Sequence, residues 1–193
     1  MILSKALIIA YKLKHQLLPH CERIEIAGSI RRRKDEVGDI EIVCLPKKEI
    51  LKNLFGWDEG IITNLLFSKE VNSLGKVIKG DTDGRMMQIE LPEGIMLDLF
   101  MPEQHDYFRQ FAIRTGSAEY AHKVIATGWI KLGWCGTKDG LRLQSECIKH
   151  DLPGGKVKWE CRNTHPTLPP AWQSEEEFFT WLGVPFTPAQ NRI

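Results

Sequence analysis

Acidic side chains stand inside two segments that otherwise have the pattern of buried β-strands. In the segment 38–43, Asp39 and Glu41 alternate with Ile40 and Ile42. Because successive side chains of a strand point to opposite faces, the two carboxylates share one face and the isoleucines share the other. Neighbouring carboxylates repel each other, and a divalent cation between them removes the repulsion. Oxygen ligands of this kind suit Mg²⁺.

A third carboxylate, Asp98, lies in the apolar segment 95–101. Any one carboxylate on a strand is more often part of the solvent-facing side of a half-covered sheet than a ligand. If the two strands are neighbours, however, all three carboxylates converge on one place. The three carboxylates alone do not decide between a metal site and a solvated sheet face.

A basic run next to a glycine turn supplies the complementary charge. Gly28 and Ser29 follow the expected strand 23–27 at a strand-to-helix turn, where free backbone N–H groups and a hydroxyl bind phosphate oxygens. The basic run 31–34 comes next, and the paired carboxylates begin directly after Gly38. An anion site beside a cation site is what a nucleoside triphosphate requires.

The elements that position these residues follow from hydrophobic periodicity, turn residues and helix caps. The pattern predicts a helix over 3–18 stopped by Pro19, strands over 23–27 and 38–45, a helix over 61–74, strands over 76–79, 85–91 and 95–101, helices on both sides of 115–117, and a last helix capped by Ser174 and Glu177. We therefore predict an α+β fold. A mixed β-sheet with helices spans residues 1–112, and a small α/β subdomain spans residues 113–193.

These motifs, in this order, resemble the nucleotidyltransferase superfamily and, over a longer stretch, the family X DNA polymerases of the DNA polymerase beta type. The residues that carry the resemblance are Gly28-Ser29-Ile30-Arg31-Arg32, Gly38-Asp39-Ile40-Glu41, Leu97-Asp98-Leu99, Thr115-Gly116-Ser117 and the C-terminal run 174–188. Order and spacing agree over about residues 22–193. The resemblance implies a minimal polymerase in which residues 1–112 form the palm and residues 113–193 form a thumb-like subdomain.

The resemblance also implies a role for each motif. It implies that two Mg²⁺ ions, or Mn²⁺ in their place, are bound by the catalytic carboxylates Asp39, Glu41 and Asp98. It implies that the triphosphate is held by Gly28, Ser29, Arg32 and Gly38, and that the nucleotide or DNA contacts Thr115, Gly116 and Ser117. The expected reaction is addition of deoxynucleotides to a primer 3′-hydroxyl, as in gap filling during DNA repair.

The sequence departs from the family pattern at several of these positions. The second carboxylate is Glu41, where the family mostly has Asp, and Ile113 and Arg114 replace aromatic residues that check the sugar. Ala121 stands where an Asn near the incoming nucleotide is common. Two alternatives therefore stay open: a transferase acting on RNA or a small molecule, and a non-catalytic nucleic-acid-binding relative. The thumb motifs weigh against the first, and the three carboxylates weigh against the second.

Composition limits the class of protein without identifying it. The 193 residues are 42% hydrophobic and 26% charged, which excludes a disordered or fibrous chain, and the net charge of +1 supplies no general attraction for nucleic acid. We expect primer-template or gapped DNA and a deoxynucleoside triphosphate as partners. Only 27 residues precede Gly28, too few for the family's N-terminal lyase and DNA-binding domains, so no lyase activity is expected.

The spacing of the cysteines and histidines shows no metal-binding pattern of these two residue types. Cysteine usage indicates an intracellular protein. The five cysteines are widely spaced and include no C-x-x-C pair, which argues against a disulfide framework and a zinc ribbon. The six histidines form no ligand spacing, and the C-terminal tryptophans are assigned to core packing. The apolar run 2–10 is too short for a membrane span. We expect a monomer that is cytoplasmic or nucleoid-associated and makes no membrane contact; viral or phage origin fits so small an enzyme.

Overall fold

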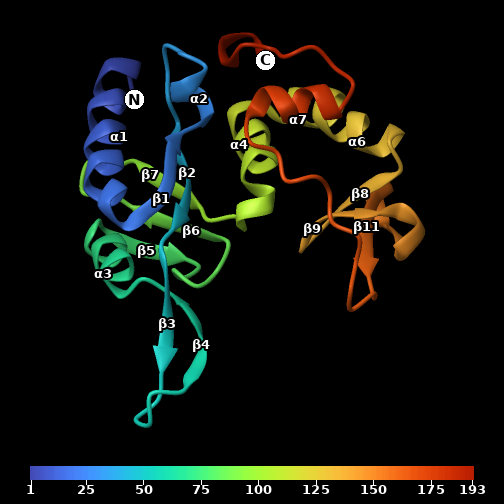
Figure 1. The fold of residues 1–193 in the computed structure, drawn as a ribbon. Helices are drawn as coiled ribbons and strands as arrows, with labels where there is room; N and C mark the ends of the chain where they lie inside the picture. Colours follow the sequence, from blue (N-terminus) through green and yellow to red (C-terminus); the bar gives the residue numbers. More distant parts are fainter.

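A computed structural model describes all 193 residues and shows a mixed sheet covered by helices, followed by a helical part that carries two small β-ribbons (Figure 1). The elements are α1 (Leu3–Leu17), β1 (Cys21–Ile26), α2 (Gly28–Arg31), β2 (Asp39–Pro46), β3 (Lys48–Lys52), β4 (Asp58–Thr63), α3 (Leu65–Ser73), β5 (Lys76–Lys79), β6 (Met86–Glu90), β7 (Met96–Phe100), α4 (Tyr107–Thr115), α5 (Ala118–Tyr120), α6 (Thr127–Lys131), β8 (Trp134–Thr137), β9 (Gly140–Leu143), β10 (Cys147–Leu152), β11 (Lys156–Cys161) and α7 (Glu175–Trp181). None of these helices combines the length and apolarity needed to span a membrane. The predicted α+β class is confirmed.

The central sheet has five strands in the order β1-β2-β7-β6-β5. Its central pair, β2 and β7, is parallel, and every other neighbouring pair is antiparallel. A parallel pair needs a crossover connection, and the chain between β2 and β7 supplies it through the β3–β4 hairpin, α3, β5 and β6. The two strands predicted to carry the carboxylates are therefore neighbours.

Alternation along β2 and β7 divides the sheet into two different faces. Ile40, Ile42 and Leu97 point into a core that α1 and α3 close, and all three are fully buried. On the opposite face, Val43 and Phe100 pack with the first turns of α4. Because α4 covers only the later residues of β2 and β7, the earlier residues of this face lie outside its cover.

The C-terminal part has its own aromatic core. Trp129, Trp134 and Trp172 are buried together with Phe178 and Phe179 of α7, which agrees with the expected packing role of the tryptophans. Ser174 caps α7 by accepting a hydrogen bond from the backbone N–H of Glu177 at 3.1 Å, as predicted. Helix α4 runs across the predicted boundary between residues 112 and 113 and contributes side chains to both sides, so the position of that boundary stays a prediction.

The predicted helix over 61–74 is wrong at its start. Residues 61–63 belong to β4, and α3 begins only after Asn64, whose side chain accepts a hydrogen bond from the N–H of Phe67 at 2.9 Å. The β3–β4 hairpin, which projects from the sheet in Figure 1, was not predicted, and neither were the β8–β9 and β10–β11 ribbons. Their pairing partners are only recognisable once the chain is folded.

A buried charge cluster joins the two ends of the chain. Glu175, 5% exposed, accepts two hydrogen bonds from Arg31 at 2.6 and 3.1 Å and one from Arg192 at 2.6 Å. Arg192 is fully buried. Burial alone would raise the pKa of Glu175, but the hydrogen bonds and charges of the two arginines outweigh it and hold the pKa below its ordinary value of 4.5. The cluster fixes α2 of the sheet domain against α7.

We predict that Glu175→Gln destabilises the protein by about 3 kcal/mol, because it leaves two arginines without their buried counter-charge. Thermal unfolding near pH 7 should show a fall in Tm of roughly 6–12 °C, whereas Glu176→Gln, on the exposed side of the same helix, should leave Tm nearly unchanged. The wild-type contribution is present above the ordinary pKa and is lost as the pH falls through the lowered one. The gap between wild type and Glu175→Gln should therefore narrow in acid; a constant gap would contradict the assignment.

Candidate active site

The three predicted carboxylates lie on the uncovered end of the sheet face that α4 partly covers. The parallel register sets Glu41 of β2 directly beside Asp98 of β7, and Asp39 is two residues earlier on β2 and points to the same face. All three side chains are partly buried. The period-two pattern and the strand pairing therefore bring the three predicted residues together.

The carboxylates act on one another electrostatically. Burial raises the pKa of Asp39 above its ordinary value of 3.8, and the charge of Asp98 raises it further. Burial raises the pKa of Glu41 to about 7, and the charge of Asp39 adds to the shift, while Arg114 and Arg32 oppose it. Like charges that are held together and partly desolvated are what a divalent cation relieves. The chemistry of this donor set therefore fits Mg²⁺.

The three carboxylates are not oriented as they would be around a bound metal ion. No group of three or more His, Cys, Asp or Glu side chains is arranged to hold a metal ion in this structure. The Glu41 carboxylate lies against Gly28, so close that a Cβ on that glycine would overlap it. Asp98 is held from the other side, because the amide of Gln88 on β6 donates a hydrogen bond to its Oδ1 at 2.9 Å. Ligation by all three carboxylates therefore requires Glu41 to turn towards the other two.

Gln88 was missed by sequence reasoning. It lies directly opposite Asp98 in the antiparallel β6–β7 pairing. Its own segment shows only a polar residue in an apolar strand, and the partner becomes visible once the register is known.

The predicted phosphate-binding turn has the expected place and leaves polar atoms unpartnered. Gly28 opens the single-turn helix α2 with φ +63°, a conformation that favours glycine. The buried atoms Ser29 Oγ and Arg32 Nε have no hydrogen-bond partner. Buried polar atoms are normally satisfied, so these two indicate a place for an anionic ligand. Gly38, the fourth predicted phosphate residue, is exposed at the start of β2.

The residues predicted to contact nucleotide or DNA, Thr115 to Ser117, make hydrogen bonds within the chain. Thr115 is fully buried, its hydroxyl accepts a hydrogen bond from Arg31 at 2.7 Å, and its carbonyl accepts one from Arg32 at 2.6 Å. Ser117 caps α5 by accepting from the N–H of Tyr120 at 3.0 Å, and Gly116 lies between them as the C-cap of α4. The bonds from Arg31 and Arg32 couple the predicted phosphate-binding turn to the C-terminal part. Contact of the three residues with nucleotide or DNA stays a prediction.

Arg114 lies between the carboxylates and the C-terminal part. Its guanidinium stacks over the Phe100 ring at 4.0 Å, and its Nε is buried without a partner. Burial lowers the pKa of Arg114, while the charge of Glu41 opposes the shift. Arg114 and Asp98 line a cavity of about 380 Å³, together with Arg85 and Lys138. A positively charged hollow therefore opens beside the third carboxylate.

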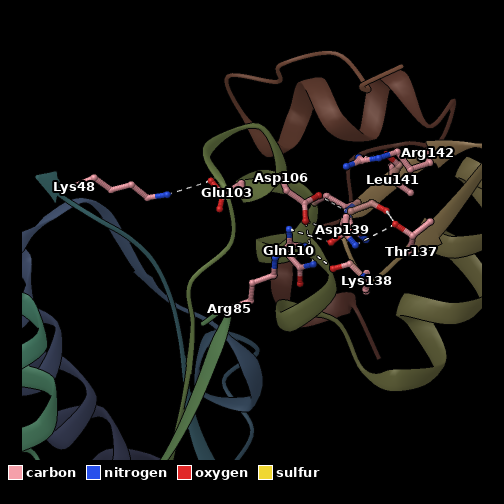
Figure 2. Close-up of polar contacts among 12 residues, drawn as sticks. Lys48, Arg85, Glu103, Asp106, Gln110, Thr137, Lys138, Asp139, Leu141 and Arg142 are labelled. Carbon is pink, nitrogen blue, oxygen red and sulfur yellow. Dashed lines mark hydrogen bonds and ion pairs between the residues drawn. The ribbon is translucent and has the colours of Figure 1, made fainter. Parts of the chain in front are cut away.

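The turn of the β8–β9 ribbon meets the sheet domain at this cavity (Figure 2). Arg85, just before β6, donates a hydrogen bond to the carbonyl of Lys138 at 2.5 Å and lies 3.9 Å from the carboxylate of Asp139. Next to this contact, Arg109 and Asp106 form a buried ion pair at 2.5 Å. The cavity beside Asp98 thus has one wall from each part of the chain.

Comparison with known proteins supports the fold and gives no sequence relative. No family model matches the chain, and no curated protein matches it by sequence. Among solved structures, it is similar to polymerase beta of Leishmania infantum in a ternary gap complex, with a TM-score of 0.65 and 16% identity, over 100% of this chain and 70% of that one. The same polymerase in a ternary P/T complex gives a TM-score of 0.62 and 17% identity, over 100% and 76%. The chain has a polymerase beta-like fold.

The positive φ of Gly28 gives a stability prediction with an internal control. Gly28→Ala should lower the free energy of unfolding by about 1–2 kcal/mol, because alanine is strained at φ +63° and its Cβ displaces the Glu41 carboxylate. Gly38→Ala should change it by less than about 0.5 kcal/mol, because no heavy atom lies within 4 Å of a Cβ there. Urea unfolding measures both. Equal effects of the two substitutions would show that the Gly28 conformation is misassigned.

Proposed function

We propose that this protein is a metal-dependent DNA polymerase of the family X type, which transfers a deoxynucleotide from its triphosphate to a primer 3′-hydroxyl. The observation that carries the proposal is the juxtaposition of three carboxylates on neighbouring strands with the unpartnered buried atoms of Ser29 and Arg32. A cation site next to an anion site matches a nucleoside triphosphate with its counter-ions. Few other ligands require a cation site and an anion site next to each other.

The acidic residues of the site would bind the metal ions. Asp39, Glu41 and Asp98 would hold two Mg²⁺ ions, or Mn²⁺ in their place. When bound there, the ions supply charge neutralisation, a lowered pKa for the attacking 3′-hydroxyl and stabilisation of the departing pyrophosphate. Asp98, oriented by the Gln88 amide, would accept the proton of that hydroxyl. Proton acceptance by Asp98 needs no other base in the site.

The opposite charges hold the rest of the nucleotide. Ser29 and Arg32 would bind the outer phosphates, with the backbone of Gly28 and Gly38 beside them. The guanidinium fork of arginine suits two phosphate oxygens at once. Arg32 also donates a hydrogen bond to the Thr115 carbonyl, so a bound triphosphate would be linked to the end of α4.

Gapped or primed DNA as the acceptor is supported by the likeness in fold to a polymerase beta in its ternary gap complex. Two other functions are candidates: one has a different acceptor for the nucleotide, and the other has no catalytic activity. Glu41 in place of Asp favours a transferase acting on RNA or a small molecule, and a non-catalytic nucleic-acid-binding relative would need none of the three carboxylates. Assays with each acceptor separate these functions.

The first test is primer extension on one-nucleotide-gapped DNA with Mg²⁺ and each deoxynucleotide. We expect template-directed incorporation by the wild type, with pyrophosphate released. Asp98→Asn should lower kcat at least about 100-fold, because loss of a hydrogen-bonding partner of a metal ligand already costs 10–100-fold and loss of the ligand costs more. Nucleotide transfer to RNA or to a small molecule without incorporation into any primed DNA would overturn the proposal. Full activity in Asp98→Asn would overturn the site assignment alone.

The second test concerns Gln88, which contacts the reacting group only through Asp98. Gln88→Leu should lower kcat about 10–100-fold and leave the KM for the nucleotide nearly unchanged. Gln16→Leu removes a similar amide contact, to Glu70 on the helix side of the sheet, and should leave both constants unchanged. If Gln88→Leu behaves like Gln16→Leu, the Gln88 bond does not position Asp98.

A further inference from the structure

Another cavity lies where the sheet domain meets the C-terminal part. It measures about 540 Å³, within the range of about 300–1,000 Å³ that small-molecule sites occupy. Its walls come from Glu22 and Arg23 of β1, from the start of α4 and from the segment that leads into α7. Figure 1 shows α4 between the sheet and the C-terminal part. The cavity shares no lining residue with the one beside Asp98 and is therefore separate from the candidate active site.

Aromatic rings and a planar guanidinium form much of the cavity wall. Tyr107 and Phe108 contribute from α4, and their rings meet edge to face with centroids 5.3 Å apart. The guanidinium of Arg23 lies over the Phe108 ring, 4.6 Å from its centroid. The C-terminal part contributes the indole of Trp172. Aromatic faces and guanidinium planes are the surfaces on which a flat aromatic ligand stacks.

Two nitrogen atoms of the lining residues are buried without a hydrogen-bond partner. They are Nε1 of Trp172, a residue that is 6% exposed, and Nε2 of the half-buried His105. The Trp172 ring is held in place by Phe178 and Trp181, with centroids 4.8 and 5.0 Å away, and its N–H can only donate. Buried polar atoms are normally satisfied. The two nitrogens therefore indicate a ligand that carries hydrogen-bond acceptors.

The charges along the lining balance one another. Glu22 and Arg23 are consecutive and of opposite sign, and Glu103 is paired with Lys48 at 3.3 Å. A cavity without excess positive charge does not select a phosphate or another anion. The ligand implied is therefore flat, aromatic, uncharged and able to accept hydrogen bonds. Nucleobases combine these properties, and proteins bind them by stacking and by hydrogen bonds to their edges.

We propose that this cavity binds a nucleobase, stacked on its aromatic wall and hydrogen-bonded by Trp172 and His105. A free nucleoside and a nucleotide within a single strand both present such a base. Because the walls come from both parts of the chain, a bound base would hold the sheet domain against the C-terminal part. The site shares no residue with the candidate active site and does not depend on the proposed function.

The test uses the full chain in EDTA with adenosine as the probe. A nucleoside has no phosphate for the Gly28 turn, and EDTA keeps metal from the carboxylates. Calorimetric titration should give one site per chain, and saturating adenosine should raise Tm. Trp172→Phe keeps a ring and removes the N–H, so it should weaken binding about 3–10-fold, and His105→Leu should do the same. Trp134→Phe, in the same aromatic core but outside the cavity, should leave the Kd unchanged.

A second measurement locates the site without any variant. Photolysis of bound 8-azidoadenosine should label peptides that contain residues 103–108 or 171–173. A deoxyadenosine octamer distinguishes the two sources of the base. Tighter binding of the octamer, weakened equally by Trp172→Phe, would assign the cavity to a single strand, and weaker binding would assign it to a free nucleoside or nucleotide.

Three results would overturn the proposal. The first is the absence of saturable adenosine binding by the wild type, which does not depend on any variant folding. The second is photolabelling confined to the Gly28 turn or to β2 and β7. The third is an equal effect of Trp172→Phe and Trp134→Phe on the Kd, because the N–H of Trp172 would then make no specific contact with the base.

Discussion

The parallel pairing of β2 with β7 is the constraint on which the rest of the structure depends. It puts Glu41 beside Asp98, with Asp39 on the same face, and it holds like charges together in a partly desolvated place. The hydrophobic side chains of the same two strands keep the arrangement in register, because a slip of one residue would turn Ile40, Ile42 and Leu97 out of the core. The free energy of core burial thus stabilises a repulsive cluster that would not form by itself. A cation is the natural ligand for it.

The remaining elements supply the opposite charge and hold it in place. The turn at Gly28 carries Ser29 and Arg32 to the carboxylates, and the hydrogen bond from Arg32 to the Thr115 carbonyl ties that turn to the C-terminal part. The buried cluster around Glu175 gives a second tie between the same two parts. Two ties therefore hold the predicted phosphate-binding turn against the C-terminal part, which suits the proposed binding of a highly charged ligand with little reorganisation.

Local patterns were enough to predict the strands that carry Asp39, Glu41 and Asp98, because period-two alternation and the Gly28-Ser29 turn are visible within ten residues. Interactions between distant residues were not predictable in this way. The contact of Gln88 with Asp98 depends on the β6–β7 register. The ion pair between Glu175 and Arg31 forms only when α7 packs against α2. The wrong helix start at residue 61 has the same origin. The apolar run of β4 looks continuous with α3 until its pairing with β3 is known.

The most direct test of the account is a crystal structure of the chain with gapped DNA, Mn²⁺ and a non-hydrolysable deoxynucleoside triphosphate. Anomalous scattering from manganese should appear among Asp39, Glu41 and Asp98, with Glu41 turned away from Gly28 and the outer phosphates beside Ser29 and Arg32. Manganese elsewhere in the molecule, or a nucleotide bound away from the Gly28 turn, would contradict the account.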